Sequence, residues 1–236
     1  MQRTGKRRRQ EQQPDMYGGE MDYQSLFTFI LEMAGTIAFA ASGAMVGAQR
    51  GMDIFGVCVL GVVTAVGGGA TRDIILGIVP PGMFQDPLYT LVATITACIV
   101  FGVMYWKQEL LEGENRLLYD KVMLVMDSIG LGVFTVMGVD KGIQQGYAGK
   151  MFFLVFLGTV TGVGGGLIRD MMAGVPPYIF VRHIYACASL VGAVVCVWVY
   201  RLFGGVPAMV TGTAVVILIR YLAAHYRWNL PRLRRE

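Results

Sequence analysis

The chain has 236 residues, of which 55% are hydrophobic, only 15% are charged and 32 are glycine, and its formal net charge is +4. A soluble domain of this length carries roughly a quarter charged residues and about 7% glycine, so the composition excludes a soluble globular protein. Because about 20 apolar residues suffice to cross a bilayer, the composition indicates an all-α polytopic membrane protein.

The first 25 residues are polar and rich in glutamine, and they include the basic stretch RTGKRRR. We predict a disordered segment at residues 1–25, because no apolar run and no small-residue cleavage pattern of a signal peptide occurs there. The following apolar runs predict seven transmembrane helices. These helices are expected at residues 26–48, 54–77, 87–106, 121–140, 151–174, 184–203 and 207–226.

The second predicted helix contains TAVGGGATRD (residues 64–73) near its C-terminal end, and the fifth contains TGVGGGLIRD (residues 161–170) at the same place. The residues around these motifs also align, including Glu32 with Asp127. One three-helix unit is therefore present twice, and its odd number of helices places the second copy upside down in the membrane. The expected parts are a first repeat at 26–106, a charged linker at 107–120, an inverted second repeat at 121–203, and a seventh helix with a basic tail at 204–236.

The glycine triplets have two interpretations. Each glycine costs a helix about 1 kcal/mol relative to alanine, and small residues allow neighbouring helices to pack closely. The alternative is a kinked helix pair whose freed carbonyls line an ion pathway, and the symmetric repetition beside charged residues favours it. Nearby hydroxyls would then help to replace the ion's hydration shell. The candidate pathway residues are Gly67, Gly68, Gly69, Gly164, Gly165, Gly166, Thr64, Thr161 and Ser42.

Charged side chains inside a membrane span are costly and usually face a bundle interior or an aqueous path. The candidates of this kind near the repeated motifs are Glu32, Arg72, Asp73, Asp127, Arg169 and Asp170. Their depths predict a Glu32–Arg72 pair at one mouth of the pathway and an Asp127–Arg169 pair at the other. The alternative is that such pairs only fix helix register. The other two aspartates lie about 100° around the helix from their neighbouring arginines, so we expect them to bond elsewhere, for example to a helix terminus.

Several function classes lack their motifs. The triplets are not followed by the Lys-Ser/Thr of a phosphate loop, and the chain has no HExxH motif or Ser-His-Asp set, so we expect neither an enzyme nor a nucleotide site. The four cysteines, at 58, 98, 187 and 196, have no metal-ligand spacing and are expected to pack as small apolar residues, with no metal or cofactor. The basic chain ends favour contact with membrane lipid over nucleic acid. The distribution of Lys and Arg predicts a cytoplasmic C-terminus.

The segments MDIFGVCVLGVVTAVGGGATRD, DSIGLGVFTVMGV and TGVGGGLIRD resemble the prokaryotic branch of the trimeric intracellular cation channels, a family also labelled as a glycine transporter domain. The resemblance extends from about residue 26 to residue 231. It implies a homotrimer in the prokaryotic inner membrane, in which each protomer holds its own pore for potassium and other monovalent cations, together with possible bound lipid. The second and fifth helices, kinked at the triplets, would line that pore.

This chain departs from the animal members of the family in two places. The animal proteins carry a Lys-Glu-Val motif on the second helix and a gating lysine on the fourth, and neither is present here. The resemblance therefore does not imply that a basic residue of this kind gates this protein. Two other functions remain open from the residues alone: a secondary transporter for a small solute such as glycine, which inverted repeats also suit, and a purely structural membrane protein.

Overall fold

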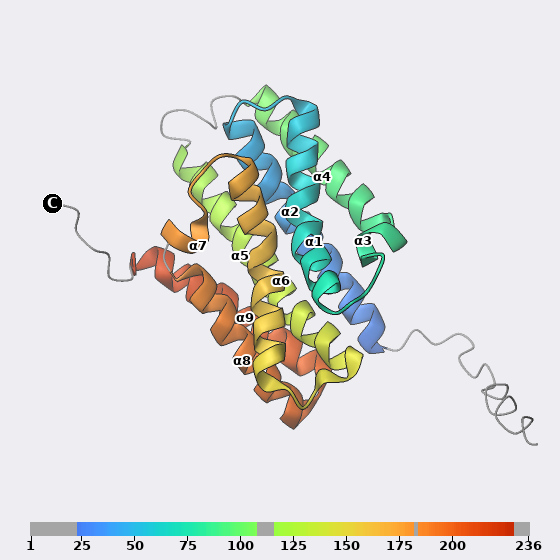
Figure 1. Cartoon of the computed structure of the whole chain (residues 1–236). Helices are drawn as coiled ribbons and strands as arrows, with labels where there is room; N and C mark the ends of the chain where they lie inside the picture. The colour runs from blue at the N-terminus through green and yellow to red at the C-terminus, as the bar shows by residue number, and fades with distance from the viewer. Residues whose placement is uncertain (1–22, 108–115, 182–183, 229–236) are drawn as a thin grey trace, which may run out of the picture.

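The computed structural model describes residues 23–107, 116–181 and 184–228, and the regular elements within these ranges are helices (Figure 1). Seven of them are long and apolar enough to cross a membrane. They are α1 (Tyr23–Gln49), α2 (Ile54–Ile75), α4 (Leu88–Trp106), α5 (Arg116–Gly142), α6 (Met151–Met172), α8 (Tyr185–Phe203) and α9 (Gly205–His225). The predicted seven-helix membrane architecture is confirmed. The segment predicted to be disordered lies almost entirely outside the described residues, as does most of the charged linker.

Helix α5 is longer than the sequence predicted. It begins at Arg116 and continues through a π-helical turn, η3 (Ile143–Tyr147), whereas the apolar run predicted only residues 121–140. Its first turns are held by packing: the buried Tyr119 donates a hydrogen bond to the carbonyl oxygen of Met45 in α1 at 3.0 Å. Hydropathy cannot register such a contact, because it measures only how apolar a stretch is.

The two copies of the motif end their helices in the same way. Gly77 and Gly174 follow α2 and α6 with φ angles of 72° and 63°, in the left-handed region that glycine adopts without strain. The next residue in each copy donates its N–H back to the carbonyl of Asp73 (2.8 Å) or of Asp170 (3.0 Å). Prolines then prevent the helix from continuing. Short helices follow at once, α3 (Gly82–Gln85) and α7 (Tyr178–Val181), and they position the functional site described below.

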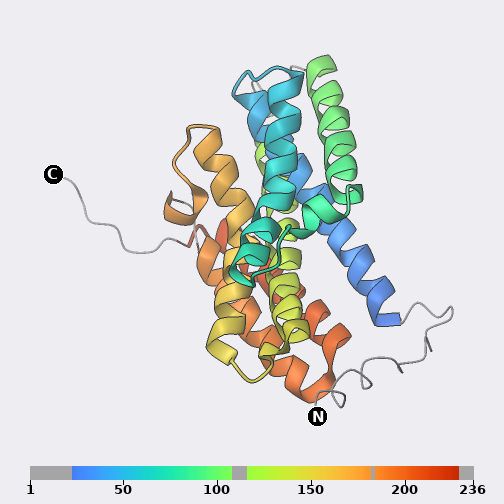
Figure 2. The same cartoon turned by 45° about the vertical axis from the view of Figure 1, so that its right-hand side comes forward.

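The two repeats are inverted. Helices α1, α2 and α4 of the first repeat pack on one another, as do α5, α6 and α8 of the second, and the repeats meet through α1 with α5 and α2 with α6. In Figure 1, α2 descends while α6 rises beside it. Helix α9 packs mainly on α5 and α8, so it belongs with the second repeat in space (Figure 2). The equivalent residues Phe39 and Phe134 stack on each other, with ring centroids 5.3 Å apart, which places both rings at the pseudo-twofold axis.

The glycine triplets do not interrupt their helices. Residues 54–75 and 151–172 are α-helical throughout, so the expected break with freed carbonyls is wrong. The packing interpretation is the correct one at the central glycines: Gly68 lies against the carbonyl oxygen of Thr161, and Gly165 lies against that of Thr64. The two helices approach so closely there that no side chain fits between them, and this contact supports both helices.

Candidate functional site

Each end of the molecule carries an equivalent set of charged and aromatic side chains. We call these sets the first-repeat cluster, made of Glu32, Arg72, Asp73 and Tyr89, and the second-repeat cluster, made of Asp127, Arg169, Asp170 and Tyr185. In each cluster the acid comes from the first helix of the repeat, the Arg-Asp pair from the second and the tyrosine from the third. Because the repeats are inverted, the clusters lie at opposite ends of the crossing between α2 and α6.

The Arg-Asp pair has the same geometry in both clusters. Arg72 Nε donates to Asp73 Oδ1 at 2.9 Å, and Arg169 Nε donates to Asp170 Oδ1 at 2.8 Å. The expectation that the aspartates avoid the neighbouring arginines is wrong, because the long, flexible arginine side chain folds back onto the aspartate.

The second oxygen of each aspartate binds a neighbouring helix terminus, which confirms the other half of that prediction. Asp73 Oδ2 accepts a hydrogen bond from the N–H of Gly82, the first residue of α3, at 2.8 Å. Asp170 Oδ2 accepts one from the N–H of Tyr178, the first residue of α7, at 2.7 Å. Helix N-termini offer unpaired N–H groups and favour negative charge, so each aspartate is bound on both sides.

The predicted Glu32–Arg72 pair is absent. Over the ranges that the structure describes, Arg72 forms its ion pair with Asp73, and Glu32 Oε2 instead accepts a hydrogen bond from the hydroxyl of Tyr89 at 2.6 Å. The physical reason is that Asp73 already neutralises Arg72, and Tyr89 reaches Glu32 from α4. Helix depth alone placed Glu32 and Arg72 at the same level, but it could not show which partner each of them meets.

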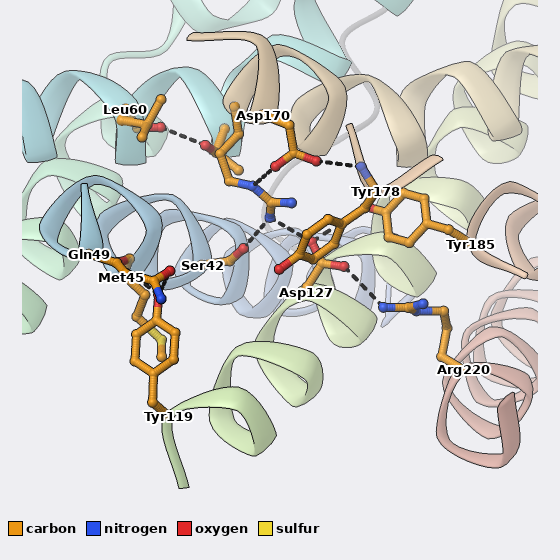
Figure 3. A network of polar contacts seen from close by, with 12 residues as sticks. Ser42, Met45, Gln49, Leu60, Tyr119, Asp127, Asp170, Tyr178, Tyr185 and Arg220 are labelled. Carbon is orange, nitrogen blue, oxygen red and sulfur yellow. Dashed lines mark hydrogen bonds and ion pairs between the residues drawn. The ribbon is translucent and has the colours of Figure 1, made fainter. Parts of the chain in front are cut away.

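The predicted Asp127–Arg169 pair is present, and more groups join it than expected (Figure 3). Arg169 Nη1 lies 2.7 Å from Asp127 Oδ1, and both side chains are fully buried. The same Nη1 donates to the hydroxyl of Ser42 on α1, so this predicted pathway hydroxyl is bound inside the cluster. The hydroxyls of Thr64 and Thr161 are also buried, and each donates to a carbonyl of the preceding turn of its own helix at 2.6 Å.

A second arginine reaches the same carboxylate. Arg220 of α9 is 3% exposed, its Nη2 lies 3.5 Å from Asp127 Oδ2, and its guanidinium lies 4.8 Å from the centre of the Tyr185 ring. Sequence reasoning missed Arg220, although a charged residue inside the seventh apolar span is the same signal that identified the other six. Helix α9 has no counterpart in the first repeat, so Arg220 makes the two ends of the molecule unequal.

The first-repeat cluster lines a cavity of about 280 Å³, which is bordered by α1 to α5. Three carboxylates and two cationic side chains face it, which leaves an excess of one negative charge. These charged residues are Glu32, Asp73, Asp86, Arg72 and Lys141. Gly69 and Phe134 form part of the apolar lining deeper in the bundle.

The corresponding space at the second-repeat cluster is filled. A Cβ atom added at Gly69 would have only the tip of Arg72 within 4 Å, whereas one at its counterpart Gly166 would collide with the hydroxyl of Tyr185. A further hollow of about 270 Å³ lies beyond the cluster and is bordered by Lys121, Arg220 and Arg227. Arg220 thus lies between the buried carboxylate of Asp127 and this second hollow.

Comparisons with known proteins give one consistent family. A family model described as glycine transporter matches residues 29–105 and 124–201. The chain is 38% identical over 209 residues to the UPF0126 inner membrane protein YadS of Escherichia coli, across 87% of this chain and 96% of that protein. It is 35% identical over 204 residues to a UPF0126 membrane protein of Deinococcus radiodurans, across 85% of this chain and 89% of that protein.

Solved structures agree with this result. The structure is similar to that of the trimeric intracellular cation (TRIC) channel orthologue from Rhodobacter sphaeroides, with a TM-score of 0.76 and 30% identity over 86% of this chain and 99% of that chain. A prokaryotic TRIC channel crystallised in 0.5 M KCl gives a TM-score of 0.78 and 28% identity over 87% and 99%. These similar structures are ion channels, which confirms the expectation that the chain is not an enzyme.

Proposed function

The chain belongs to the prokaryotic TRIC cation channel family, and from this premise we propose that it is a passive channel for monovalent cations such as potassium. The observation that carries the proposal is the cavity at the first-repeat cluster. Its carboxylates outnumber its cationic side chains, and a hollow with excess negative charge raises the local concentration of cations. The relatives of known structure are cation channels, which favours this function over solute transport.

We place the pathway along the side of α2 that carries Gly69 and the equivalent side of α6 that carries Gly166. Gly69 borders the open cavity, and Gly166 lies under the Tyr185 hydroxyl. A cation would enter the cavity, pass the ring of Phe134 and meet the second-repeat cluster. In the described conformation that cluster is fully packed, so we infer a closed channel whose opening requires the cluster to separate.

We further propose a homotrimer with one pathway in each protomer, located in the inner membrane with the C-terminus in the cytoplasm. The structure from Rhodobacter sphaeroides is of a trimeric channel, and the Escherichia coli relative is an inner membrane protein. The side of α4 that carries Leu91, Ile95 and Ile99 is exposed and apolar, so lipid or a second protomer can cover it.

The decisive experiment uses the purified full-length chain in planar bilayers with a potassium gradient. We expect discrete unitary currents whose reversal potential follows the potassium gradient. Saturable uptake of glycine into proteoliposomes, without unitary currents, would contradict a channel and support a transporter.

Replacing Gly69 with leucine is expected to lower the unitary potassium conductance several-fold while leaving the protein folded. The added side chain would extend into the open cavity, where only the tip of Arg72 lies within 4 Å of the new Cβ. Single-channel recording measures the conductance, and thermal unfolding measures stability. Gly102→Leu is the matched control, because Gly102 is another helical glycine with nothing within 4 Å and lies on α4, away from the cavity. Equal conductance in both variants would contradict the placement of the pathway.

Replacing Arg220 with glutamine is expected to raise the open probability. Arg220 attaches α9 to Asp127 at the closed end, and its loss leaves that carboxylate with fewer partners. A change of 1–2 kcal/mol in the opening equilibrium corresponds to a roughly 5–30-fold change in the open/closed ratio. Single-channel recording measures this ratio, with Arg201→Gln on the exposed surface of α8 as the control. An unchanged open probability would show that Arg220 does not hold the channel closed.

A further inference from the structure

Two cysteines of different helices meet at a place that the proposed pathway does not use. Sγ of Cys58 in α2 lies 3.4 Å from Sγ of Cys98 in α4, and neither thiol is part of a disulfide. Cys98 is exposed and Cys58 is half-buried, so both are accessible from the surface of the bundle. The sequence reading of these cysteines as isolated packing residues does not account for two sulfur atoms in contact.

The surroundings of the two thiols are apolar. They border a hollow of about 500 Å³ whose other lining residues are Ile54, Phe55, Val59, Val62, Val63 and Thr94. Among the described lining residues the other polar side chain is that of Thr94, whose hydroxyl donates to the carbonyl of Thr90 at 2.8 Å. None of the described residues that line this hollow is charged. A species bound there must therefore form a complex with no net charge, because an isolated charge is costly in apolar surroundings.

The fold does not need cysteine at either position. The second repeat carries Val155 and Val194 at the equivalent positions. The alignment is supported by matching contacts: a Cβ at Gly61 would meet Ala97, and a Cβ at its counterpart Gly158 would meet Ala193. The first repeat therefore places two thiols side by side where its own duplicate uses valine.

We propose that Cys58 and Cys98 form a binding site for a soft cation that takes two sulfur ligands, such as Cu⁺, Ag⁺ or Hg²⁺. Thiolate sulfur selects soft metals, and the one hydroxyl among the described lining residues, that of Thr94, already donates to the Thr90 carbonyl. Metal–thiolate bonds are about 2.3 Å long, so a linear arrangement needs a sulfur separation of roughly 4.6 Å. The hollow beside the thiols leaves room for the side chains to separate from 3.4 Å to that distance.

The requirement for a neutral complex fixes how many protons are released. A monovalent ion binds one thiolate and one thiol, with the loss of one proton to solvent. Hg²⁺ binds two thiolates with the loss of two protons. In either case the metal bridges α2 to α4, so the bound form resists thermal unfolding more than the free form does.

The test uses Ag⁺ in chloride-free buffer and the full chain carrying Cys187→Ala and Cys196→Ala, so that only the two proposed ligands remain. We expect one Ag⁺ and one released proton per chain. Removal of the metal by a monothiol competitor should require at least tenfold more competitor than in variants that retain only Cys58 or only Cys98. Binding of two Ag⁺ per chain, or equal sensitivity to the competitor, would show that the thiols act separately and would overturn the proposal.

A second measurement does not depend on the alanine background. Dibromobimane becomes fluorescent when one molecule bridges two thiols, and we expect it to label the unmodified chain unless Ag⁺ is added first. The double variant Cys58→Val, Cys98→Val should not be labelled, and it should remain folded because the second repeat uses valine at both positions. Fluorescence that is the same in this variant, or that Ag⁺ does not suppress, would contradict the site.

Discussion

Replacing Gly68 with alanine is expected to destabilise the protein by about 3 kcal/mol, at the upper end of the cost of overpacking a core. The new methyl group would overlap the carbonyl oxygen of Thr161 in α6, and the backbone nitrogen of Gly165 in the same helix is the next atom that it would approach. Backbone atoms cannot rotate away as a side chain can, so α2 and α6 must move apart. The same result is expected for Gly165→Ala, which would meet the carbonyl oxygen of Thr64.

The first triplet offers its own control for this effect. A methyl group at Gly67 would come too close only to the flexible end of Ile168 and would touch Val63 at an ordinary contact distance, so Gly67→Ala should cost far less than Gly68→Ala. Gly102→Ala, with open space around it, should be neutral or slightly stabilising. Thermal unfolding in detergent and the yield of monodisperse protein measure the differences. Equal stability of the Gly67 and Gly68 variants would rule out the close backbone contact.

Replacing Asp127 with asparagine is expected to cost roughly 3–5 kcal/mol, the usual cost of breaking a buried ion pair by removing one partner. In the second-repeat cluster and Arg220, the positive charges of two arginines are balanced by the negative charges of two aspartates. The substitution removes one negative charge, so Arg169 and Arg220 are left with Asp170. Glu32→Gln at the equivalent position should cost much less. Glu32 borders an open cavity and is bound by the neutral hydroxyl of Tyr89.

A double variant separates the charge effect from a simple loss of contacts. Adding Arg220→Met to Asp127→Asn restores the balance of one arginine and one aspartate, so the double variant should be more stable than Asp127→Asn alone. Guanidinium-induced or thermal unfolding gives the coupling between the two sites. Additive or worse destabilisation would show that Arg220 and Asp127 do not interact across the space between α9 and α5.

The sequence was sufficient for those parts of the structure that depend on repetition and on hydropathy. Seven helices, the inversion of the repeats and the Asp127–Arg169 pair follow from apolar runs and from the alignment of the two copies. The capped ends of α2 and α6 follow the Gly and Pro positions in the same way. These features are local, or they occur twice, so a single chain contains enough information to reveal them.

The predictions that were wrong concern which atoms meet in three dimensions. The repetition of the triplets beside charged residues favoured a helix break, whereas the proximity of α6 to Gly68 shows that the central glycines form a packing surface. Glu32 and Arg72 lie at similar depth, yet each meets a nearer partner. Arg220 joins the opposite cluster from a helix outside the repeat, so no internal alignment could indicate its role.

The different partners of the two clusters predict an order of assembly during synthesis. Each charged group of the first-repeat cluster that forms a polar contact forms it within its own repeat: Arg72 with Asp73, and Glu32 with Tyr89. That repeat can therefore enter the lipid with these charges already satisfied, whereas a charge without a partner would make insertion costly. The second-repeat cluster takes Ser42 from a helix made earlier and Arg220 from the last helix made. Its polar contacts are complete only when α9 has entered the membrane. A chain truncated before α9 would therefore be inserted without the contact between Arg220 and Asp127.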